Sequence, residues 1–382
     1  MTLKANWNYP TAVRFGPGRI AELAQACRAA GIERPLLVTD SGLSGLPMIK
    51  DAVAQLSADG LKVTLFDRVQ ANPVAANVED GLKVLRDSGS DGVIAFGGGS
   101  ALDCGKVVAF MAGQSRPMWD FEDIGDWWTR ADPSGIAPII AVPTTAGTGS
   151  EVGRAGVITD ETTQTKKVIF HPKMMPQIVI CDPELTVGLP AKVTVGAGMD
   201  ALAHCLEAYC APGFHPLADG IAVEGIRLCK VFLPRAVADG ADIEARAQMM
   251  AAAAMGATAF QKGLGAIHAL SHPIGSVHHT HHGMTNAVFM PYVLNFNRPA
   301  IEEKIARLAA YLGLEPSFGA FYDWIIALRR ELDVPETLKA FGVTAIDYGR
   351  LAKMAIVDPT AGGNPVPLTE AAADALFREA TG

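Results

Sequence analysis

The sequence has no run of lysine and arginine residues, and its formal net charge is −8 with an isoelectric point near 5.6. It therefore lacks the basic surface that nucleic-acid-binding proteins present to phosphates. Charged residues make up only 19% of the chain and hydrophobic residues 49%, a balance typical of a well-buried globular enzyme. We expect no nucleic acid as a partner.

Long apolar runs and paired cysteines are also missing. The most apolar segment, 249–260, is too short to cross a bilayer and contains Gly256. Met1–Lys4 leads directly into polar sequence, so no signal peptide is expected. The six cysteines are scattered and form no CxxC motif, which is typical of reduced thiols in a protein core. The sequence predicts a cytoplasmic protein with no membrane partner.

With 382 residues the chain is long enough for two domains. Its first part alternates strand and helix patterns, which predicts a parallel sheet with helices on both faces. From about Leu189 alanine-rich segments dominate, and seven to nine helices are expected. We predict an α/β domain over 1–184 and an all-α domain over 185–382.

The expected strands of the first part are 35–40, 62–66, 92–96, 136–142 and 177–181, with helices at 18–30, 47–58, 74–88 and 101–112. The expected helices of the second part are 193–209, 216–239, 243–261, 284–295, 300–312, 318–332, 345–355 and 369–380, separated by proline or glycine.

Six of the nine histidines lie between His268 and His282. His268 and His272 are four residues apart and share one face of a helix. Pro273 and Gly275 are expected to loosen or end that helix, so that His282 returns toward the same face. Imidazole is the commonest protein ligand for borderline divalent metals. Taken alone, the cluster is equally compatible with a histidine-rich surface turn.

A carboxylate lies upstream. Asp200 and His204 are also four residues apart, on a stretch with strong helical character and mostly apolar neighbours. Burying an aspartate and a histidine there is costly unless they are paired or bind a metal. Alone, the pair is more often a salt link within a helix; together with the second histidine cluster, it favours a metal site.

Two glycine-rich turns follow expected strands. Three glycines at 97–99 allow a diphosphate to approach the backbone at the start of the next helix. Threonines and glycines at 143–151 follow another strand, at the end where ligands of such sheets bind. Either turn alone is weak evidence and more often structural, but the two together favour a nucleotide site.

Two further residues have both a cofactor and a structural interpretation. Asp40 ends the first expected strand, where its carboxylate can accept hydrogen bonds from the adenosine ribose and repel a 2′-phosphate. It can equally cap the turn that follows. Asn72, before Pro73, can contact the cofactor or form an Asn-Pro turn.

Four motifs together resemble the iron-containing (group III) alcohol dehydrogenases. They are GGGS-x-x-D-x-x-K at 97–106, PTT-x-GTGSEV at 143–152, GMDALAHCLEAY at 198–209 and HALSHPIG…HHG-x-x-NA at 268–287. The likeness covers essentially the whole chain and looks strongest to the branch of 4-hydroxybutyrate and other short-chain alcohol dehydrogenases. It implies a dehydroquinate-synthase-like fold, with an NAD(P)-binding α/β domain followed by a helical metal domain, and a homodimer.

The resemblance also implies the roles of individual residues. The metal ligands fall on Asp200, His204, His268 and His282, and the additional active-site histidine on His272. His272 is then either a proton relay or a hydrogen-bonding partner of the ligands. His281 stands where family members often have proline, beside two further histidines, His278 and His279. The cofactor positions fall on Asp40, Asn72, Gly98, Gly99, Ser100, Asp103, Thr144, Thr145, Thr148 and Lys167.

The implied activity is that of an enzyme that interconverts a small primary alcohol, or an ω-hydroxy acid, and its aldehyde by hydride transfer. The implied metal is Fe²⁺, although three histidines and an aspartate also accept Zn²⁺, Mn²⁺, Co²⁺ or Ni²⁺. NAD is expected rather than NADP because of Asp40. The alternatives are a metal-independent reductase of the maleylacetate type and a non-catalytic protein that binds metal and nucleotide.

Two cations lie near the motifs in sequence. Arg154 or Lys262 can receive a substrate carboxylate. Arg154 is at least as compatible with a structural ion pair, and Lys262 with a solvated helix end.

Overall fold

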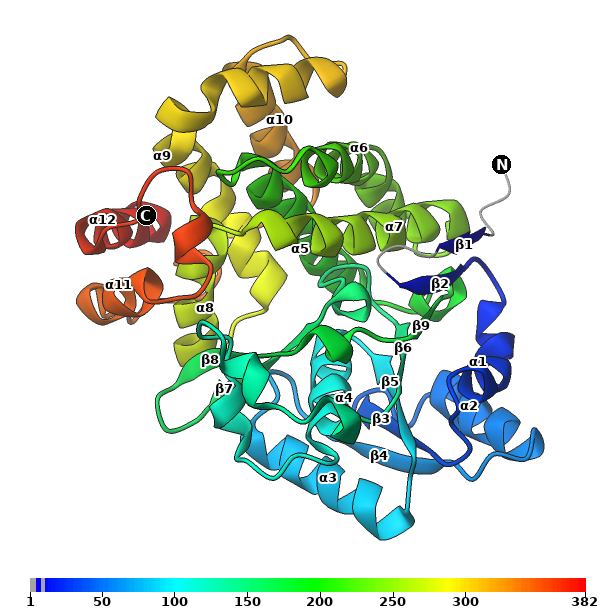
Figure 1. The fold of residues 1–382 in the computed structure, drawn as a ribbon. Helices are drawn as coiled ribbons and strands as arrows, with labels where there is room; N and C mark the ends of the chain where they lie inside the picture. Colours follow the sequence, from blue (N-terminus) through cyan, green and yellow to red (C-terminus); the bar gives the residue numbers. More distant parts are fainter. Residues whose placement is uncertain (1–4, 8–10) are drawn as a thin grey trace. The chain divides into compact units, whose positions relative to one another are not determined.

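The computed structural model describes residues 5–7 and 11–382 (Figure 1). Met1–Lys4, on which the expectation about a signal peptide rests, lie outside the described residues. The chain divides into two compact units. The sheet unit comprises Met1–Thr145 with Gly149–Gly188, and the helical unit comprises Ala146–Thr148 with Leu189–Gly382. Among the helices described, none is both long enough and apolar enough to cross a membrane.

A seven-stranded sheet forms the centre of the sheet unit, in the order β1-β2-β9-β6-β5-β3-β4. All neighbouring strands are parallel except β1, which is antiparallel to β2. The register pairs Gly97 with Pro143, so the strands that precede the two glycine-rich turns end side by side. The strands are β1 (Ala5–Trp7), β2 (Ala12–Phe15), β3 (Pro35–Asp40), β4 (Thr64–Val69), β5 (Gly92–Gly97), β6 (Ile139–Pro143) and β9 (Ile178–Cys181).

Helices cover both faces of this sheet, which confirms the predicted α/β arrangement (Figure 1). Alternation along β3 explains the two layers: Leu36 and Val38 pack in one apolar cluster and Leu37 in the other. The first cluster includes residues of α3 (Ala75–Ser88) and α4 (Gly99–Met111), and the second includes residues of α1 (Leu23–Ala29) and α2 (Pro47–Ala58). A short 3₁₀ segment, η1 (Arg19–Glu22), precedes α1.

Some boundaries in the sheet unit differ from those expected. The fourth predicted strand begins at Ile139 instead of 136, after Pro138, whose nitrogen carries no hydrogen for the sheet. The second begins at Thr64 and continues to Val69. An antiparallel hairpin of β7 (Ala155–Asp160) and β8 (Thr165–Phe170) was not predicted. The loop at 119–133 contains short 3₁₀ segments, η2 (Met118–Phe121), η3 (Trp127–Arg130) and η4 (Pro133–Gly135).

The helical unit contains eight α-helices within its described residues, in the range expected. They are α5 (Ala191–Cys210), α6 (Pro216–Ala238), α7 (Ile243–Ala259), α8 (Ala266–His278), α9 (His282–Tyr311), α10 (Phe318–Glu331), α11 (Tyr348–Ile356) and α12 (Glu370–Thr381). The remaining 3₁₀ segments of the chain are η5 (Ser150–Val152), η6 (Pro172–Met174), η7 (Pro183–Thr186), η8 (Phe260–Lys262) and η9 (Ala361–Gly363).

Two expectations about proline were wrong. Pro273 does not end α8, which continues to His278. Helix α9 passes through Pro291 and Pro299, where two separate helices were expected. Pro273 and Pro291 lie among buried apolar residues such as Ile274 and Leu294, whereas Pro299 is exposed. Tertiary packing of this kind outweighs the hydrogen bond that a proline removes.

All six cysteines are buried and free of disulfide bonds, as the sequence predicts. Burial raises the pKa of Cys27, Cys210 and Cys229 to about 12. These thiols are therefore protonated and serve as small apolar residues.

Candidate active site

Helix α5 presents its polar residues on one buried face. Asp200, His204 and Glu207 follow one another at spacings of four and three residues, so they lie one above another along the helix. Nearly every residue from Thr194 to Cys210 is buried, and most are small or apolar. Partners from α8 and α9 offset the cost of burying Asp200 and Glu207.

Three imidazoles surround one carboxylate oxygen. The distances from Asp200 Oδ1 to Nε2 of His204, His268 and His282 are 3.8, 3.6 and 3.5 Å. A tetrahedral site with bonds of about 2.0–2.2 Å has ligand atoms about 3.3–3.6 Å apart. Ligand atoms of Asp200, His204 and His268 all lie within 4.8 Å of one another; His282 lies outside this tight group but contacts Asp200. The donor set therefore fits a divalent cation.

Asn286 contacts this centre from α9. Its Nδ2 lies 2.8 Å from Asp200 Oδ1 and 3.2 Å from the Nε2 atoms of both His268 and His282. Its Oδ1 is buried and has no hydrogen-bond partner among the described residues. A cluster with so many buried lone pairs and so few donors is electrostatically suited to a cation. The sequence interpretation did not single out Asn286, although it lies within the HHG-x-x-NA motif.

The local charges shift the pKa values of the candidate ligands. Burial opposes ionisation of Asp200, but the imidazoles of His204 and His282 hold its pKa well below the ordinary value. Burial lowers the pKa of His204 to about 4, so this ring is neutral near pH 7. Burial also disfavours the charged form of His268, but Glu207 and Asp200 outweigh it and raise its pKa to about 9. Metal binding at His268 must therefore displace a proton.

His272 lies beside the proposed ligands and has its own partner. Its ring stacks on that of His282, with centroids 5.2 Å apart. Its Nδ1 is 2.8 Å from Asp358 Oδ2, and Asp358 Oδ1 accepts hydrogen bonds from the backbone N–H and Oγ1 of Thr360. Although Asp358 is buried, the charge of His272 holds its pKa below the ordinary value. Asp358 is an ionised acceptor, so His272 donates from Nδ1.

The neighbouring histidines have structural contacts. His279 ends α8 in the left-handed conformation, with φ 54°. The Nδ1 of His281 accepts a hydrogen bond of 3.4 Å from the backbone N–H of Met284 and caps α9. The ring of His281 also occupies the space beside Gly196, where a Cβ would clash with it. The cap gives His281 a role that requires no metal.

The glycine-rich turns meet at the carboxyl ends of β5 and β6. The backbone N–H of Thr144 donates to the carbonyl of Gly97 at 3.0 Å, and a Cβ on Gly98 would lie 3.4 Å from Thr145. Gly97 has φ 150°, and a Cβ there would lie 2.7 Å from that of Ala101. No side chain caps the amides that begin α4. These amides are suited to an anion such as a diphosphate.

Asp40 and Asn72 lie at neighbouring turns of the same unit. Oδ1 of Asp40 accepts hydrogen bonds from the backbone N–H groups of Gly42 and Leu43, at 2.9 and 3.0 Å. Asp40 therefore caps the turn after β3, which is one of the two roles considered. Asn72 has φ 55°, and its N–H donates to Ser100 Oγ at 3.3 Å.

Of the three other expected cofactor residues, Thr148 lies within the second turn, Asp103 contacts that turn through Ser150, and Lys167 has its described contacts elsewhere. Asp103 accepts hydrogen bonds from Ser150 Oγ and from the backbone N–H of Val157, which join α4 to η5 and to β7. Lys167 Nζ lies 3.0 Å from Asp160 and 3.6 Å from Glu122. Thr148 belongs to the helical unit.

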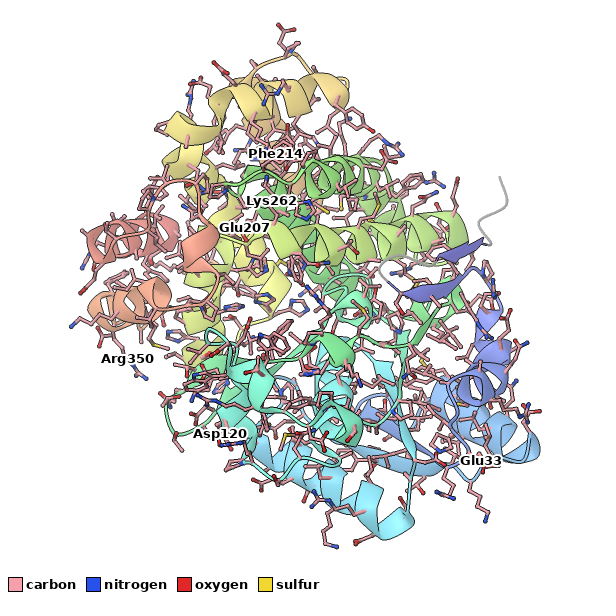
Figure 2. All side chains as sticks on the ribbon, viewed as in Figure 1. Glu33, Asp120, Glu207, Phe214, Lys262 and Arg350 are labelled. Carbon is pink, nitrogen blue, oxygen red and sulfur yellow. The ribbon has the colours of Figure 1, made fainter. Side chains whose placement is uncertain are left out.

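The structure also shows the contacts of Lys262 and Arg154, the two cations considered for a substrate carboxylate. Lys262 (labelled in Figure 2) is not at a solvated helix end: its side chain is 2% exposed, and Nζ lies 2.6 Å from Asp219 Oδ1 and 3.2 Å from the carbonyl of Tyr209. Lys262 thus pairs with Asp219, which lies in the first turn of α6. The guanidinium of Arg154 lies 5.5 Å from the ring centre of Phe170.

Two family models match the chain. The model of iron-containing alcohol dehydrogenase matches residues 10–183, and that of the C-terminal part of the Fe-containing alcohol dehydrogenase family matches residues 194–381. A 4-hydroxybutyrate dehydrogenase from Cupriavidus necator is 39% identical over 367 residues, which cover 94% of each chain.

Solved structures of related proteins also match the fold of this chain. A 1,3-propanediol oxidoreductase has a TM-score of 0.91 and 35% identity, with both chains covered completely. A sulfoacetaldehyde reductase from Bifidobacterium kashiwanohense in complex with NAD⁺ has a TM-score of 0.87 and 29% identity, covering 100% of this chain and 98% of that one. Matches over both units, together with the histidine-rich cluster, show that this oxidoreductase chain belongs to the iron-containing alcohol dehydrogenase family.

Proposed function

We propose that the protein is a metal-dependent, NAD-linked dehydrogenase that interconverts a small primary alcohol and its aldehyde. The observation that carries this proposal is the convergence of three imidazole Nε2 atoms on Asp200 Oδ1, at 3.5–3.8 Å. Asp200, His204, His268 and His282 would hold the ion. We propose Fe²⁺ on family grounds, with Zn²⁺, Mn²⁺, Co²⁺ and Ni²⁺ as metals that the same donors accept.

A bound divalent ion would supply Lewis acidity that favours loss of the alcohol proton, and the nicotinamide would supply the hydride acceptor. The chain itself supplies the proton route. His272 donates from Nδ1 to Asp358, which leaves the lone pair of Nε2 free to receive a proton. We propose that His272 takes the hydroxyl proton and passes it to solvent, with Asp358 holding the ring in the required tautomer.

The glycine-rich turns are the proposed cofactor site. Backbone amides at Gly98, Gly99 and Ser100 would bind the diphosphate, and Asp40 the adenosine ribose. Thr144, Thr145 and Asn72 are the side chains next to these amides. Asp103, Thr148 and Lys167 complete the proposed set by family resemblance. The negative charge of Asp40 and the NAD⁺ named with the sulfoacetaldehyde reductase support NAD over NADP.

An ω-hydroxy acid is the proposed substrate class. Two of the relatives carry names whose compounds have an anionic group at the far end, 4-hydroxybutyrate and sulfoacetaldehyde. Because the ammonium of Lys262 is already paired with Asp219, we do not assign it to the substrate. A desolvated ion pair with another cation would favour the acid over the matching neutral alcohol by about 1–3 kcal/mol in kcat/KM.

The test compares 4-hydroxybutyrate with 1-butanol, using NAD⁺ and NADP⁺ and the Fe²⁺-reconstituted enzyme. Oxidation of both alcohols, with the acid preferred, supports the whole proposal. Equal use of the two leaves a plain alcohol dehydrogenase and contradicts the anionic substrate. Activity that survives complete chelation would point instead to the metal-independent reductase, and nucleotide binding without any turnover to a non-catalytic protein.

We also propose that the enzyme works as a cytoplasmic homodimer. Six buried, unpaired cysteines support a reducing compartment, and the dimer is proposed from family resemblance. Light scattering on the purified protein tests the dimer, and cell fractionation tests the compartment.

A further inference from the structure

Glu207 (labelled in Figure 2) connects α5 to the beginning of α8. Its Oε2 bonds to Nδ1 of His268, and its Oε1 accepts a hydrogen bond of 2.7 Å from the backbone N–H of Ile267. The residue is buried, as are His268 and Ile267. One carboxylate thus contacts both the side chain of a proposed ligand and the backbone beside it.

The beginning of α8 shows why a carboxylate stands there. No side chain of Gly265 is available to cap the helix, so its first amides need acceptors from elsewhere. Asn364 Oδ1 accepts from the N–H of Ala266 at 3.0 Å, and Glu207 accepts from the next N–H, that of Ile267. The negative charge of Glu207 also suits the positive end of the helix dipole. Capping alone would explain one of its two oxygens.

The other oxygen determines the form of the His268 ring. An imidazole can bind a metal through Nε2 only if the proton of the neutral ring is on Nδ1. Nε2 of His268 faces Asp200 at 3.6 Å and Nδ2 of Asn286 at 3.2 Å. At the opposite side of the ring, a carboxylate accepts hydrogen bonds and cannot donate, so Glu207 requires the proton to be on Nδ1.

We propose that Glu207 is a positioning residue for the metal centre, which fixes His268 in the Nδ1–H tautomer with Nε2 directed at the ion. This inference rests on the proposed metal site. The affinity for metal then depends on the carboxylate of Glu207, and not only on the ligands themselves. Hydrogen-bonding partners of metal-binding histidines typically contribute about 10–100-fold in affinity.

Two substitutions separate positioning from capping. In Glu207→Gln, the amide oxygen can accept from Ile267 while the NH₂ group faces Nδ1 of His268, which then becomes an acceptor with its proton on Nε2. Metal binding at Nε2 must then move the proton back to Nδ1, where the N–H of the ring would face the NH₂ group of the new amide, donor against donor. In Glu207→Ala, neither tautomer is blocked. Positioning predicts metal affinity reduced by about 10–100-fold in Glu207→Gln, at least as much as in Glu207→Ala. Capping alone predicts a near-normal Glu207→Gln.

The experiment measures Zn²⁺ affinity of the metal-free full-length proteins by competition with a chromophoric chelator at one pH. Thermal unfolding of the metal-free proteins is recorded in parallel, and Glu207→Gln is expected to unfold within a few degrees of wild type. Glu302→Gln serves as the matched control, because that carboxylate pairs with Arg298 on the exposed surface of α9. Asp200→Ala serves as the variant without a proposed ligand.

The outcomes distinguish the two proposals. If Glu207→Gln binds Zn²⁺ within threefold of wild type while Asp200→Ala has lost it, the positioning role is wrong and the metal site stands. If wild type does not bind Zn²⁺, or Asp200→Ala binds it as tightly as wild type, the proposed metal site itself fails. Nitrogen NMR of ¹⁵N-histidine-labelled wild type with Zn²⁺ gives a test that needs no Glu207 variant: a proton on Nε2 of His268 would overturn the inference.

Discussion

Replacing Asp40 by asparagine should weaken the preference for NAD⁺ over NADP⁺ without disturbing the turn after β3. Oδ1 of Asp40 holds that turn by accepting from Gly42 and Leu43. An asparagine keeps this acceptor and removes the negative charge. The substitution therefore isolates the electrostatic part of the proposed discrimination, which Asp40→Gly would mix with loss of both hydrogen bonds.

The size of the effect follows from Coulomb's law. Two unit charges 4 Å apart repel by about 1 kcal/mol in water and about 4 kcal/mol at an effective dielectric constant of 20. Asp40 is partly exposed, so an intermediate value of about 1–3 kcal/mol applies to a 2′-phosphate beside it. The ratio of kcat/KM for NAD⁺ to that for NADP⁺ should then fall by about 5–150-fold.

The assay measures both kcat/KM values with one saturating alcohol, supported by binding of each cofactor to the metal-free protein. Asp91→Asn is the matched control, because Asp91 also caps a turn, through Glu33 and Arg34, but before β5 and away from the carboxyl ends of the strands. An unchanged ratio in Asp40→Asn, or a wild type that prefers NADP⁺, would refute the role assigned to Asp40.

Three further outcomes are expected. Asp200→Ala and His268→Ala should lose bound metal and turnover but retain NAD⁺ affinity, because each removes one proposed ligand; near-normal metal content by elemental analysis would contradict the ligand set. Asp358→Asn should lower kcat by about 10–100-fold at unchanged metal content, since it removes a charged hydrogen bond worth about 1.5–3 kcal/mol from His272; an unchanged kcat and solvent isotope effect would exclude the proton route. Burial raises the pKa of Glu151 from 4.5 to about 7, so its contribution to stability is present below pH 4.5 and lost as pH rises through 7. Glu151→Gln should therefore gain about 1–3 kcal/mol relative to wild type between pH 5 and 8 in urea unfolding, and a pH-independent difference would show that Glu151 ionises normally.

Local sequence patterns predicted much of the fold. Apolar strands such as Leu36–Val38 and the spacing of Asp200 and His204 are visible within a few residues of sequence. The structure contains the five expected strands and, apart from the two that are continuous in α9, the expected helices. Proline was misleading because its local cost is small beside the packing of a whole helix, as at Pro273 in α8. The β7–β8 hairpin was missed because the residue types of Ala155–Asp160 do not follow the alternating burial of that strand, and burial hardly alternates along β8.

The partners of the candidate site were the part that sequence patterns could not supply. Asp358 lies 86 residues from His272, and no local feature distinguishes it from any other aspartate after a helix. Glu207 stands one turn beyond His204 on the same face of α5, a spacing that could have drawn attention to it. Its function depends on α8, whose position no pattern within α5 indicates.

The six buried cysteines have a practical consequence for studying this enzyme. Three lie in the sheet unit (Cys27, Cys104 and Cys181) and three in the helical unit (Cys205, Cys210 and Cys229). A thiol reagent can reach them only when the surrounding structure opens, because the folded protein hides each sulfur and keeps it protonated. Timed alkylation followed by peptide mass spectrometry thus reads the opening of each unit separately. Adding nucleotide or metal would show which of the two units each ligand stabilises against opening. The native cysteines serve as the probes, so no residue has to be changed.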